Sequence, residues 1–211
     1  MERLCSLSNK NALLLPLFCF LLWLAGCATA PPSRPEDICD IFDEKSGWYD
    51  DAKAAYERWG TPIQVQMSII YQESGYRHNV KPPRTKLLWI IPWRRPSTAY
   101  GYTQALDSTW AWYKKDSGNG WADRDDFDDA TDFVGWYVNK SHQVIGISKW
   151  DAYSNYLAYH EGQTGYKRGT YKKKSWLIKT ARRVNARSDR YAQQLHGCRE
   201  RLESGFSLWP F

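Results

Sequence analysis

The sequence predicts a mainly α-helical fold, and three observations support this prediction. Apolar residues recur at intervals of three and four in several segments, which is the period of a helix that buries one face. Glycine and proline stand at the ends of several of these segments, where helices typically stop and start. No stretch alternates apolar and polar residues over a length that would build a sheet, and no internal repeat is visible. We therefore expect one helical domain.

Six helical segments are expected, each recognised by its apolar period and its ends. They span residues 43–59, 62–74, 108–115, 126–143, 149–160 and 175–195. The first ends at Gly60, after which Thr61 is expected as the N-cap and Pro62 as the first helical residue. Apolar residues expected in the core of the later helices are Phe133, Trp136, Tyr137, Val144, Trp176, Val184, Tyr191 and Leu195.

Residues 81–96 differ in composition from the helical segments around them. The segment holds four prolines, is basic at its edges and has an apolar centre at residues 87–91. Because proline disfavours both helix interiors and central strands, we expect a small irregular or hairpin-like excursion here.

The first 26 residues are expected to be a secretory signal. Arg3 and Lys10 precede an almost purely apolar run at residues 12–24, which is shorter than a typical membrane span. The sequence Leu24-Ala25-Gly26-Cys27 at its end resembles the lipobox of bacterial lipoproteins. Cleavage before Cys27 would leave that thiol to carry a lipid anchor. The alternative is a plain signal peptide that is cut near residues 28–30.

The lipoprotein interpretation implies a domain order and a location. It gives a signal peptide at 1–26, a lipidated tether at 27–40, a folded domain at 41–200 and a tail at 201–211. Residue 28 is alanine rather than aspartate, which by analogy with enteric lipoproteins implies anchoring to the outer membrane, facing the periplasm. Of the remaining cysteines, Cys39 and Cys198 could form a disulfide in this oxidising compartment. The alternative is two separate thiols.

Charge and aromatic content narrow the class of ligand. The net charge is +6, and basic residues are concentrated in 166–190, as in a polyanion-binding patch or a solvated helix face. Nucleic acid is not expected outside the cytoplasm, which leaves acidic wall peptides or anionic lipid. The chain also has 12 tryptophans and 14 tyrosines, which serve either as core or as the lining of a carbohydrate groove.

Glu73 is the first candidate for a catalytic residue. On the helix expected at 62–74, Val65, Ile69 and Glu73 lie at successive i+4 positions on one face. A carboxylate that continues an apolar row is partly desolvated, and desolvation raises its pKa. A carboxylic acid that stays protonated near neutral pH is what general-acid cleavage of a glycosidic bond requires. The alternative is an exposed charge in the last helical turn.

Three short motifs, in this order, resemble those of the soluble, goose-lysozyme-like lytic transglycosylases. That family shows Glu-Ser, then Gly-Leu-Met-Gln, then Ala-Tyr-Asn-Ala-Gly, on helices of a lysozyme-like domain. The matching positions here are Glu73, Ser74, Gly101, Gln104, Ala158, Tyr159 and Gly162. The resemblance covers about residues 48–185 and implies a lysozyme-like helical domain.

The resemblance also implies an activity and roles for residues. The activity is non-hydrolytic cleavage between N-acetylmuramic acid and N-acetylglucosamine in peptidoglycan, leaving a 1,6-anhydro end. Glu73 is then the single acid and base, and Tyr159 orients it. Ser74 and Gln104 are expected to bind the sugar or the acid, and Gly101 to let the backbone approach the glycan. No cofactor is required, and endo or exo cleavage and protein partners stay open.

Departures from the second and third family motifs keep alternatives open. Tyr102-Thr103 replaces Leu-Met in the second motif. His160 and Glu161 replace Asn-Ala, so His160 is expected to supply the sugar contact of the missing asparagine. Glu161 is either a salt-bridge partner of nearby basic residues or, like Asp107, a second carboxylate for hydrolysis. A muramidase and a non-catalytic wall-binding lipoprotein therefore stay as alternatives. The four histidines are dispersed, and no metal-ligand spacing or phosphate-binding loop is visible.

Overall fold

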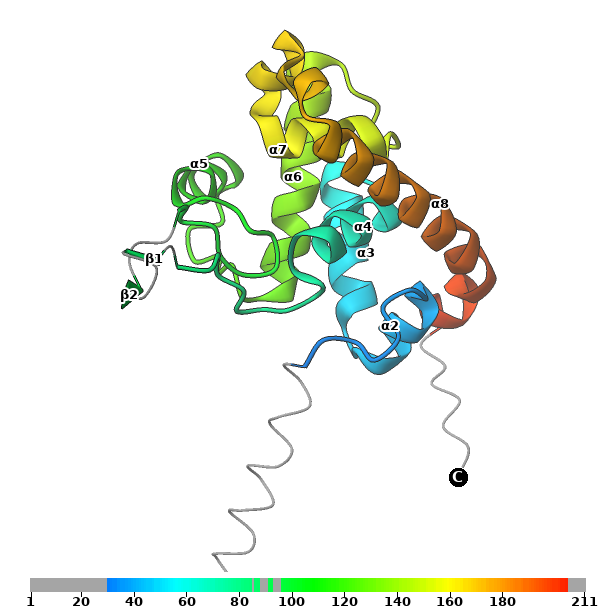
Figure 1. Cartoon of the computed structure of the whole chain (residues 1–211). Helices are drawn as coiled ribbons and strands as arrows, with labels where there is room; N and C mark the ends of the chain where they lie inside the picture. Colours follow the sequence, from blue (N-terminus) through cyan, green and yellow to red (C-terminus); the bar gives the residue numbers. More distant parts are fainter. Residues whose placement is uncertain (1–29, 85, 88–90, 93–95, 205–211) are drawn as a thin grey trace, which may run out of the picture. The chain divides into compact units, whose positions relative to one another are not determined.

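Helices carry almost all the regular structure in the computed structural model, which describes residues 30–84, 86–87, 91–92 and 96–204 (Figure 1). The helices in these residues are α2 (Ile38–Glu44), α3 (Trp48–Trp59), α4 (Ile63–Ser74), α5 (Asp107–Ser117), α6 (Phe127–Ile145), α7 (Ala152–Arg168), the 3-10 helix η1 (Thr170–Lys173) and α8 (Ser175–Glu203). Two short strands, β1 (Lys86–Leu87) and β2 (Ile91–Pro92), complete the described elements. The prediction of a mainly helical fold is confirmed.

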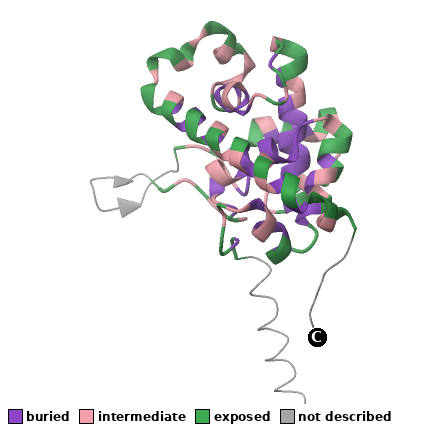
Figure 2. Ribbon diagram, turned by 90° about the vertical axis from the view of Figure 1, so that its right-hand side faces the viewer, coloured by how far each residue is buried: buried purple, intermediate pink, exposed green. Residues whose placement is uncertain are grey.

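The helices α4 and α6 form the centre of the folded unit that begins at Pro31. Every residue of α4 from Ile63 to Ile70 is buried, and so is every residue of α6 from Ala130 to Val138. A helix that is buried all round belongs in the core rather than at the surface. Figure 2 shows the buried residues gathered in the middle of the helical unit, with exposed residues on its outer helices.

Close helix packing explains one glycine of α6. The helices α3 and α6 lie against each other, and a Cβ atom added to Gly135 would lie 2.8 Å from the indole ring of Trp59. The same indole donates a hydrogen bond to Asp132, with 2.6 Å between nitrogen and oxygen. A larger residue at position 135 would therefore push α3 away from the centre.

The long helix α8 packs along α4 and α7 and also meets α2 (Figure 1). The side chain of Asp37 caps α2 by accepting from the backbone N–H groups of residues 39 and 40. Ile38 is fully buried, and its backbone N–H donates to the side-chain oxygen of Gln194 at 3.1 Å. Residues 31–40 thus belong to the fold, whereas the sequence placed a tether there.

The two ends of the folded unit are tied together. Cys39 on α2 and Cys198 on α8 form a disulfide across 159 positions of sequence, with 6.1 Å between their Cα atoms. Nearby, Arg201 donates to Asp43 at 2.5 Å. The helix α8 continues to Glu203, whereas the sequence predicted that a tail begins at residue 201.

The segment 81–96 contains a small antiparallel pair of strands. Lys86 lies opposite Pro92, and Leu87 lies opposite Ile91. The pairing agrees with the hairpin-like excursion that the sequence predicts. Most of the apolar centre of this segment lies outside the described residues.

Several details of the prediction are wrong, and most concern helix faces and ends. Val144 and Trp176 were expected in the core, but they are 60% and 56% exposed. Val144 is the next-to-last residue of α6, and Trp176 lies in the first turn of α8. Thr61 does not cap α4: Pro62 holds the cap position, and the Thr61 hydroxyl donates to the carbonyl of Gly135. The helix α2 was not predicted.

Part of the expected basic patch is used inside the fold. Arg187 and Arg190 both donate to Glu36, and the Arg187 guanidinium lies 3.8 Å from the centre of the Tyr71 ring. Lys174 pairs with Glu161 at 2.6 Å. The remaining lysines and arginines of η1 and α8 are mostly exposed, as a solvated helix face would be.

The signal peptide, the lipobox and Cys27 lie outside the described residues. Among the residues that are described, none of the helices has the length and apolar character needed to span a bilayer.

Candidate active site

Glu73 lies in a pocket with a volume of about 570 Å³. The pocket is lined by Glu73, Ala99, Gln104, Ala105, Leu106, Thr109, Phe133, Tyr137, Tyr159, His160, Glu161 and Gly162. These residues come from the end of α4, the loop before α5, and the helices α5, α6 and α7. The volume lies within the range of pockets that hold small ligands, including sugar residues.

The sequence around Glu73 explains its position in the last turn of α4. Gly75 ends the helix in the left-handed conformation, with φ of 61°, and its N–H closes the last turn on the carbonyl of Tyr71. Val65 and Ile69, which precede Glu73 at i+4 spacing, are fully buried. The apolar row therefore leads from the core to the pocket, where Glu73 is its last member.

Burial raises the pKa of Glu73 to about 7, while a hydrogen bond from the hydroxyl of Tyr156 lowers it to a smaller extent. Desolvation disfavours the charged form of a carboxyl group because the surrounding protein solvates charge less well than water. Near neutral pH, Glu73 is thus divided between the acid, which can donate a proton, and the carboxylate, which can accept one.

Gln104 also lines the pocket and has an unusual backbone. Its φ of 51° is one of two positive values at non-glycine positions among the described residues. Its amide nitrogen donates to the carbonyl oxygens of Val80 at 3.0 Å and Gly101 at 2.8 Å. Because both hydrogen bonds use the nitrogen, the amide oxygen is left as the group that could accept from a ligand.

Tyr159 holds the loop that carries Gln104. Its hydroxyl donates to the backbone carbonyl of Thr103 at 2.7 Å, and its ring lies against Phe133 and Tyr137. The sequence assigned the orientation of Glu73 to Tyr159, but the hydroxyl that reaches Glu73 is that of Tyr156, one turn earlier on α7. The two tyrosines thus fix the two sides of the pocket separately.

Ser74 and Gly101, although part of the motifs, do not line the pocket. Ser74 is 2% exposed, and its hydroxyl donates to the carbonyl of Ile70 within α4. A Cβ atom added to Gly101 would lie 2.0 Å from the carbonyl oxygen of Arg124. The close approach that this glycine permits is therefore to another part of the chain.

A comparison with protein-family models decides the family. The model described as "Transglycosylase SLT domain" matches residues 15–198, most of the chain. The chain belongs to the transglycosylase SLT domain family. This confirms the resemblance drawn from the three motifs and agrees with the lysozyme-like helical fold. Membership indicates lytic transglycosylase activity on peptidoglycan. No curated protein and no solved structure matches the chain.

The departures of this SLT domain from the third family motif, His160 and Glu161, are among the residues that line the pocket. The carboxylate of Glu161 accepts from Lys174 at 2.6 Å, from His160 at 3.0 Å and from Thr170. Burial raises the pKa of Glu161, but these hydrogen bonds outweigh it and lower the pKa to about 2. Glu161 is therefore a salt-bridged anion, and His160 is held beside it at the edge of the pocket.

Asp107, the other carboxylate considered from the sequence, does not line the pocket of this SLT domain. Its side chain is 63% exposed and pairs with Arg124 at 2.8 Å. It lines a separate cavity together with Trp110, Lys114 and Lys115.

The sequence missed Tyr156 and the apolar wall of the SLT pocket. Tyr156 lies three residues before Tyr159, so both project from one face of α7, and this spacing could have identified it. Phe133 and Tyr137 were assigned to the core, and they are in fact buried while also lining the pocket. Many of the other aromatic residues form the core, including Trp136, Tyr76, Tyr113 and Tyr191.

Proposed function

We propose that this protein is a peptidoglycan lytic transglycosylase in which Glu73 alone serves as acid and base. The bond cleaved is the β-1,4 link from N-acetylmuramic acid to N-acetylglucosamine, and the product carries a 1,6-anhydromuramyl end. The observation that carries the proposal is that, of the two carboxyl groups that line the pocket, Glu73 has its pKa raised to about 7, whereas that of Glu161 is lowered to about 2. Family membership supports the substrate class.

The chemistry needs one group that first gives a proton and then takes one. Protonated Glu73 transfers its proton to the bridging oxygen as the bond from that oxygen to C1 of the muramyl residue breaks. The N-acetyl group of the same sugar stabilises the positive charge at C1. The Glu73 carboxylate then takes the proton of the 6-hydroxyl, whose oxygen bonds to C1. No water is consumed, and Glu73 ends protonated as it began.

The surroundings of Glu73 fit this double role. A pKa near 7 leaves both protonation states accessible at neutral pH, so neither step requires a large free-energy cost. Tyr156, which is 4% exposed, hydrogen-bonds to Glu73 and stabilises its carboxylate form. The amide oxygen of Gln104 is available to accept from a sugar hydroxyl on the other side of the pocket.

Hydrolysis by a muramidase is the second candidate, and the two other carboxylates fit it poorly. A general base that activates water must be free to accept a proton. The Glu161 carboxylate is held by three donors, with its pKa lowered to about 2. Asp107 lies outside the pocket and pairs with Arg124. Cleavage through the sugar's own hydroxyl avoids the need for either group.

The test combines a substitution with analysis of products from isolated peptidoglycan. Glu73→Gln keeps the size of the side chain but cannot donate and accept a proton, so we expect the rate to fall about 100-fold or more. Mass spectrometry of products from the unaltered chain should show muramyl ends lighter by one water than reducing ends. Reducing ends would instead establish the muramidase. Equal cleavage by the Glu73→Gln chain would remove Glu73 from the mechanism, and absence of cleavage by either chain would favour a non-catalytic wall-binding protein.

We further propose that the protein is a lipoprotein of the outer membrane, anchored through Cys27 and facing the periplasm. The apolar run at residues 12–24 followed by Leu24-Ala25-Gly26-Cys27 supports this location. Metabolic labelling with a palmitate analogue should mark the unaltered chain but not the Cys27→Ser variant. Equal labelling of both chains would contradict lipidation at Cys27.

A further inference from the structure

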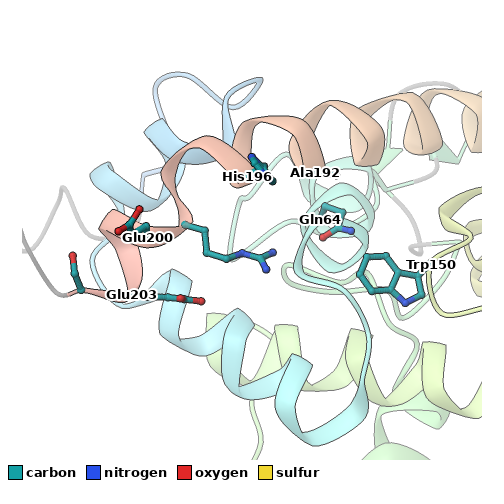
Figure 3. Close-up of a pocket in the computed structure, with 8 residues that line it drawn as sticks. Gln64, Trp150, Ala192, His196, Glu200 and Glu203 are labelled. Carbon is teal, nitrogen blue, oxygen red and sulfur yellow. The ribbon is translucent and has the colours of Figure 1, made fainter.

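A second cavity lies between α8, α4 and the loop that joins α6 to α7. Its volume is about 720 Å³, larger than that of the pocket around Glu73. It is lined by Gln64, Trp150, Ala192, His196, Arg199, Glu200, Glu203 and Ser204. Figure 3 shows Trp150 and Gln64 toward one end of the cavity and Glu200 and Glu203 toward the other.

Helix geometry separates this cavity from the pocket of Glu73. Gln64 and Glu73 both lie on α4, nine positions apart. Nine residues correspond to about 14 Å along the helix axis, and to two and a half turns. The two side chains therefore leave α4 at opposite ends and on opposite faces, so a ligand of one site does not occupy the other.

Gln64 is the observation that marks the cavity as a binding site. Its side chain lines the cavity although the residue is only 8% exposed. None of the described residues hydrogen-bonds its amide group, whereas the amide of Gln66, two residues later, donates to two backbone carbonyls. The little surface that Gln64 exposes lines the cavity, so its amide, which has no protein partner among the described residues, is free to bond to a ligand there.

Trp150 supplies an apolar surface at the same place. It is 65% exposed, but the loop that carries it is fixed: Lys149 donates to the carbonyl of Trp59 at 2.6 Å, and Asn155 donates to that of Ser148 at 2.8 Å. Single exposed tryptophans are common and need no explanation on their own. An exposed indole on a fixed loop, next to an available amide, however, requires little ordering of the backbone when a ligand binds.

The chemistry of the lining favours an uncharged ligand with an acetamido group. A primary amide can donate to and accept from an N-acetyl group, and the negative face of an indole attracts the C–H groups on one face of a pyranose ring. One cation and two anions line the cavity, Arg199 with Glu200 and Glu203. This excess of negative charge disfavours an acidic peptide. Hydroxyl groups of a sugar, by contrast, can bond to all three side chains.

We propose that this cavity is a second saccharide-binding site that takes N-acetylated glycan. The site adjoins a smaller cavity that shares Gln64, Trp150, Arg199 and Glu203 and adds Tyr56, which is 41% exposed. Because the two cavities share these four residues, they lie side by side on the same surface. The identification of the glycan as peptidoglycan rests on the proposed function. Its role is to hold the enzyme on the insoluble wall while the Glu73 pocket cleaves.

Calorimetric titration with the tetramer of N-acetylglucosamine tests the proposal. The full chain carries Glu73→Gln so that the probe is not consumed, and two binding events per chain are expected. Adding Trp150→Ala should weaken one event about tenfold or more, and adding Gln64→Met should weaken the same event about fivefold. Trp121→Ala is the matched control, because Trp121 is 98% exposed and lines neither cavity. A single event in every chain, or two events that Trp150→Ala leaves unchanged, would overturn the proposal.

Two further readouts distinguish this proposal from others. In the chain with Glu73 intact, Trp150→Ala should lower cleavage of insoluble peptidoglycan several-fold and leave cleavage of short soluble glycan strands unchanged. Equal loss on both substrates would indicate a structural defect and contradict a separate site. Titration with a wall stem peptide tests the other class of ligand. If the peptide bound at Trp150 and the saccharide did not, the saccharide-site proposal would be wrong and the ligand would be a peptide. The number of binding events does not depend on catalysis. A failure of the second-site proposal can therefore be distinguished from a failure of the proposed function.

Discussion

At the scale of single residues, Glu73 depends on a balance between burial and one hydrogen bond. Burial raises its pKa to about 7, and the Tyr156 hydroxyl opposes that rise by stabilising the carboxylate. Since the first step needs the acid form, activity should fall as the pH increases through about 7. This fall in activity at alkaline pH, the alkaline limb of the pH profile, reports the pKa of Glu73.

Tyr156→Phe should move that alkaline limb to higher pH. The substitution removes the hydrogen bond that favours the carboxylate and leaves the ring in place, so the acid form persists to higher pH. The measurement is kcat/KM on soluble glycan strands as a function of pH. Tyr159→Phe is the matched control because its hydroxyl bonds to Thr103 and not to Glu73. An alkaline limb that stays in place in Tyr156→Phe would contradict the assigned contact.

Glu73 should also lower the stability of the fold at alkaline pH. Its folded pKa is raised above the unfolded value of 4.5, so the folded state binds the proton more tightly and loses stability as the pH rises from about 4.5 through 7. Glu73→Gln removes this cost and should raise the free energy of unfolding at pH 8 by about 1 to 3 kcal/mol. Urea unfolding at pH 8 and pH 4 measures it. A gain of equal size at pH 4, where both states of the unaltered chain are protonated, would argue against a titration effect.

The sequence predicted the principal acid, but not the contacts that tune it. The i+4 row of Val65, Ile69 and Glu73 is a local property of one helix and can be recognised from spacing alone. The partnership of Glu73 with Tyr156 joins α4 to α7, which are distant in sequence. Spacing within one helix cannot identify such a contact.

At the scale of elements, the turn before α5 depends on Gly101. Its φ is +75°, and its N–H donates to the carbonyl of Val80 at 3.0 Å. The neighbouring N–H of Tyr102 donates to the carbonyl of Arg124 at 3.1 Å, which brings the two backbones together. This packing places Gln104 on the pocket, so Gly101 acts on the site through the shape of the turn.

Gly101→Ala should therefore destabilise the fold by about 2 kcal/mol or more, through both the positive φ and the contact with Arg124. Gly118→Ala is a suitable control, because Gly118 has a φ of +78° but its added Cβ would meet nothing within 4 Å. The control should show only the smaller cost of the backbone conformation, about 1 kcal/mol. Thermal unfolding of both variants measures the difference. Equal costs would show that the contact with Arg124 relaxes without penalty.

The presence of a helix could be predicted where the apolar residues recur with helical spacing over several turns. The residues at which the helices begin and end could be predicted less well. The start of α6 was predicted correctly near Asp126, which caps the helix, but its end was predicted at residue 143, whereas α6 continues to Ile145 before Gly146. The short helix α2 has too few residues for a visible period, and its stability comes from packing on α8. Trp176 has the spacing of a core residue, but it lies in the first turn of α8, where it contacts the exposed His160 ring instead.

At the scale of the whole molecule, the disulfide between Cys39 and Cys198 ties α2 to α8, the first and last of the described helices. The pairing of two cysteines near opposite ends followed from the sequence, given an oxidising compartment. The packing of residues 31–40 did not, because prolines near a chain end also mark tethers. The disulfide lies on α2 and α8, away from the pocket of Glu73.

Replacing both cysteines with serine should lower the free energy of unfolding by about 2 to 4 kcal/mol, because the unfolded chain gains conformational freedom. Activity at a temperature where the variant is folded should stay close to that of the unaltered chain. Urea unfolding with and without a reductant checks the first expectation, and a parallel assay checks the second. Loss of activity in a fully folded variant would show that the disulfide positions the site.

The central claim is that Glu73 closes the muramyl ring with the sugar's own hydroxyl and without water. Cleavage of peptidoglycan in water enriched with heavy oxygen tests this most directly. The account predicts that muramyl ends released by the unaltered chain contain no heavy oxygen, since the 6-hydroxyl supplies the atom that bonds to C1. Heavy oxygen at C1 of the released ends would contradict the account and show that water is the nucleophile.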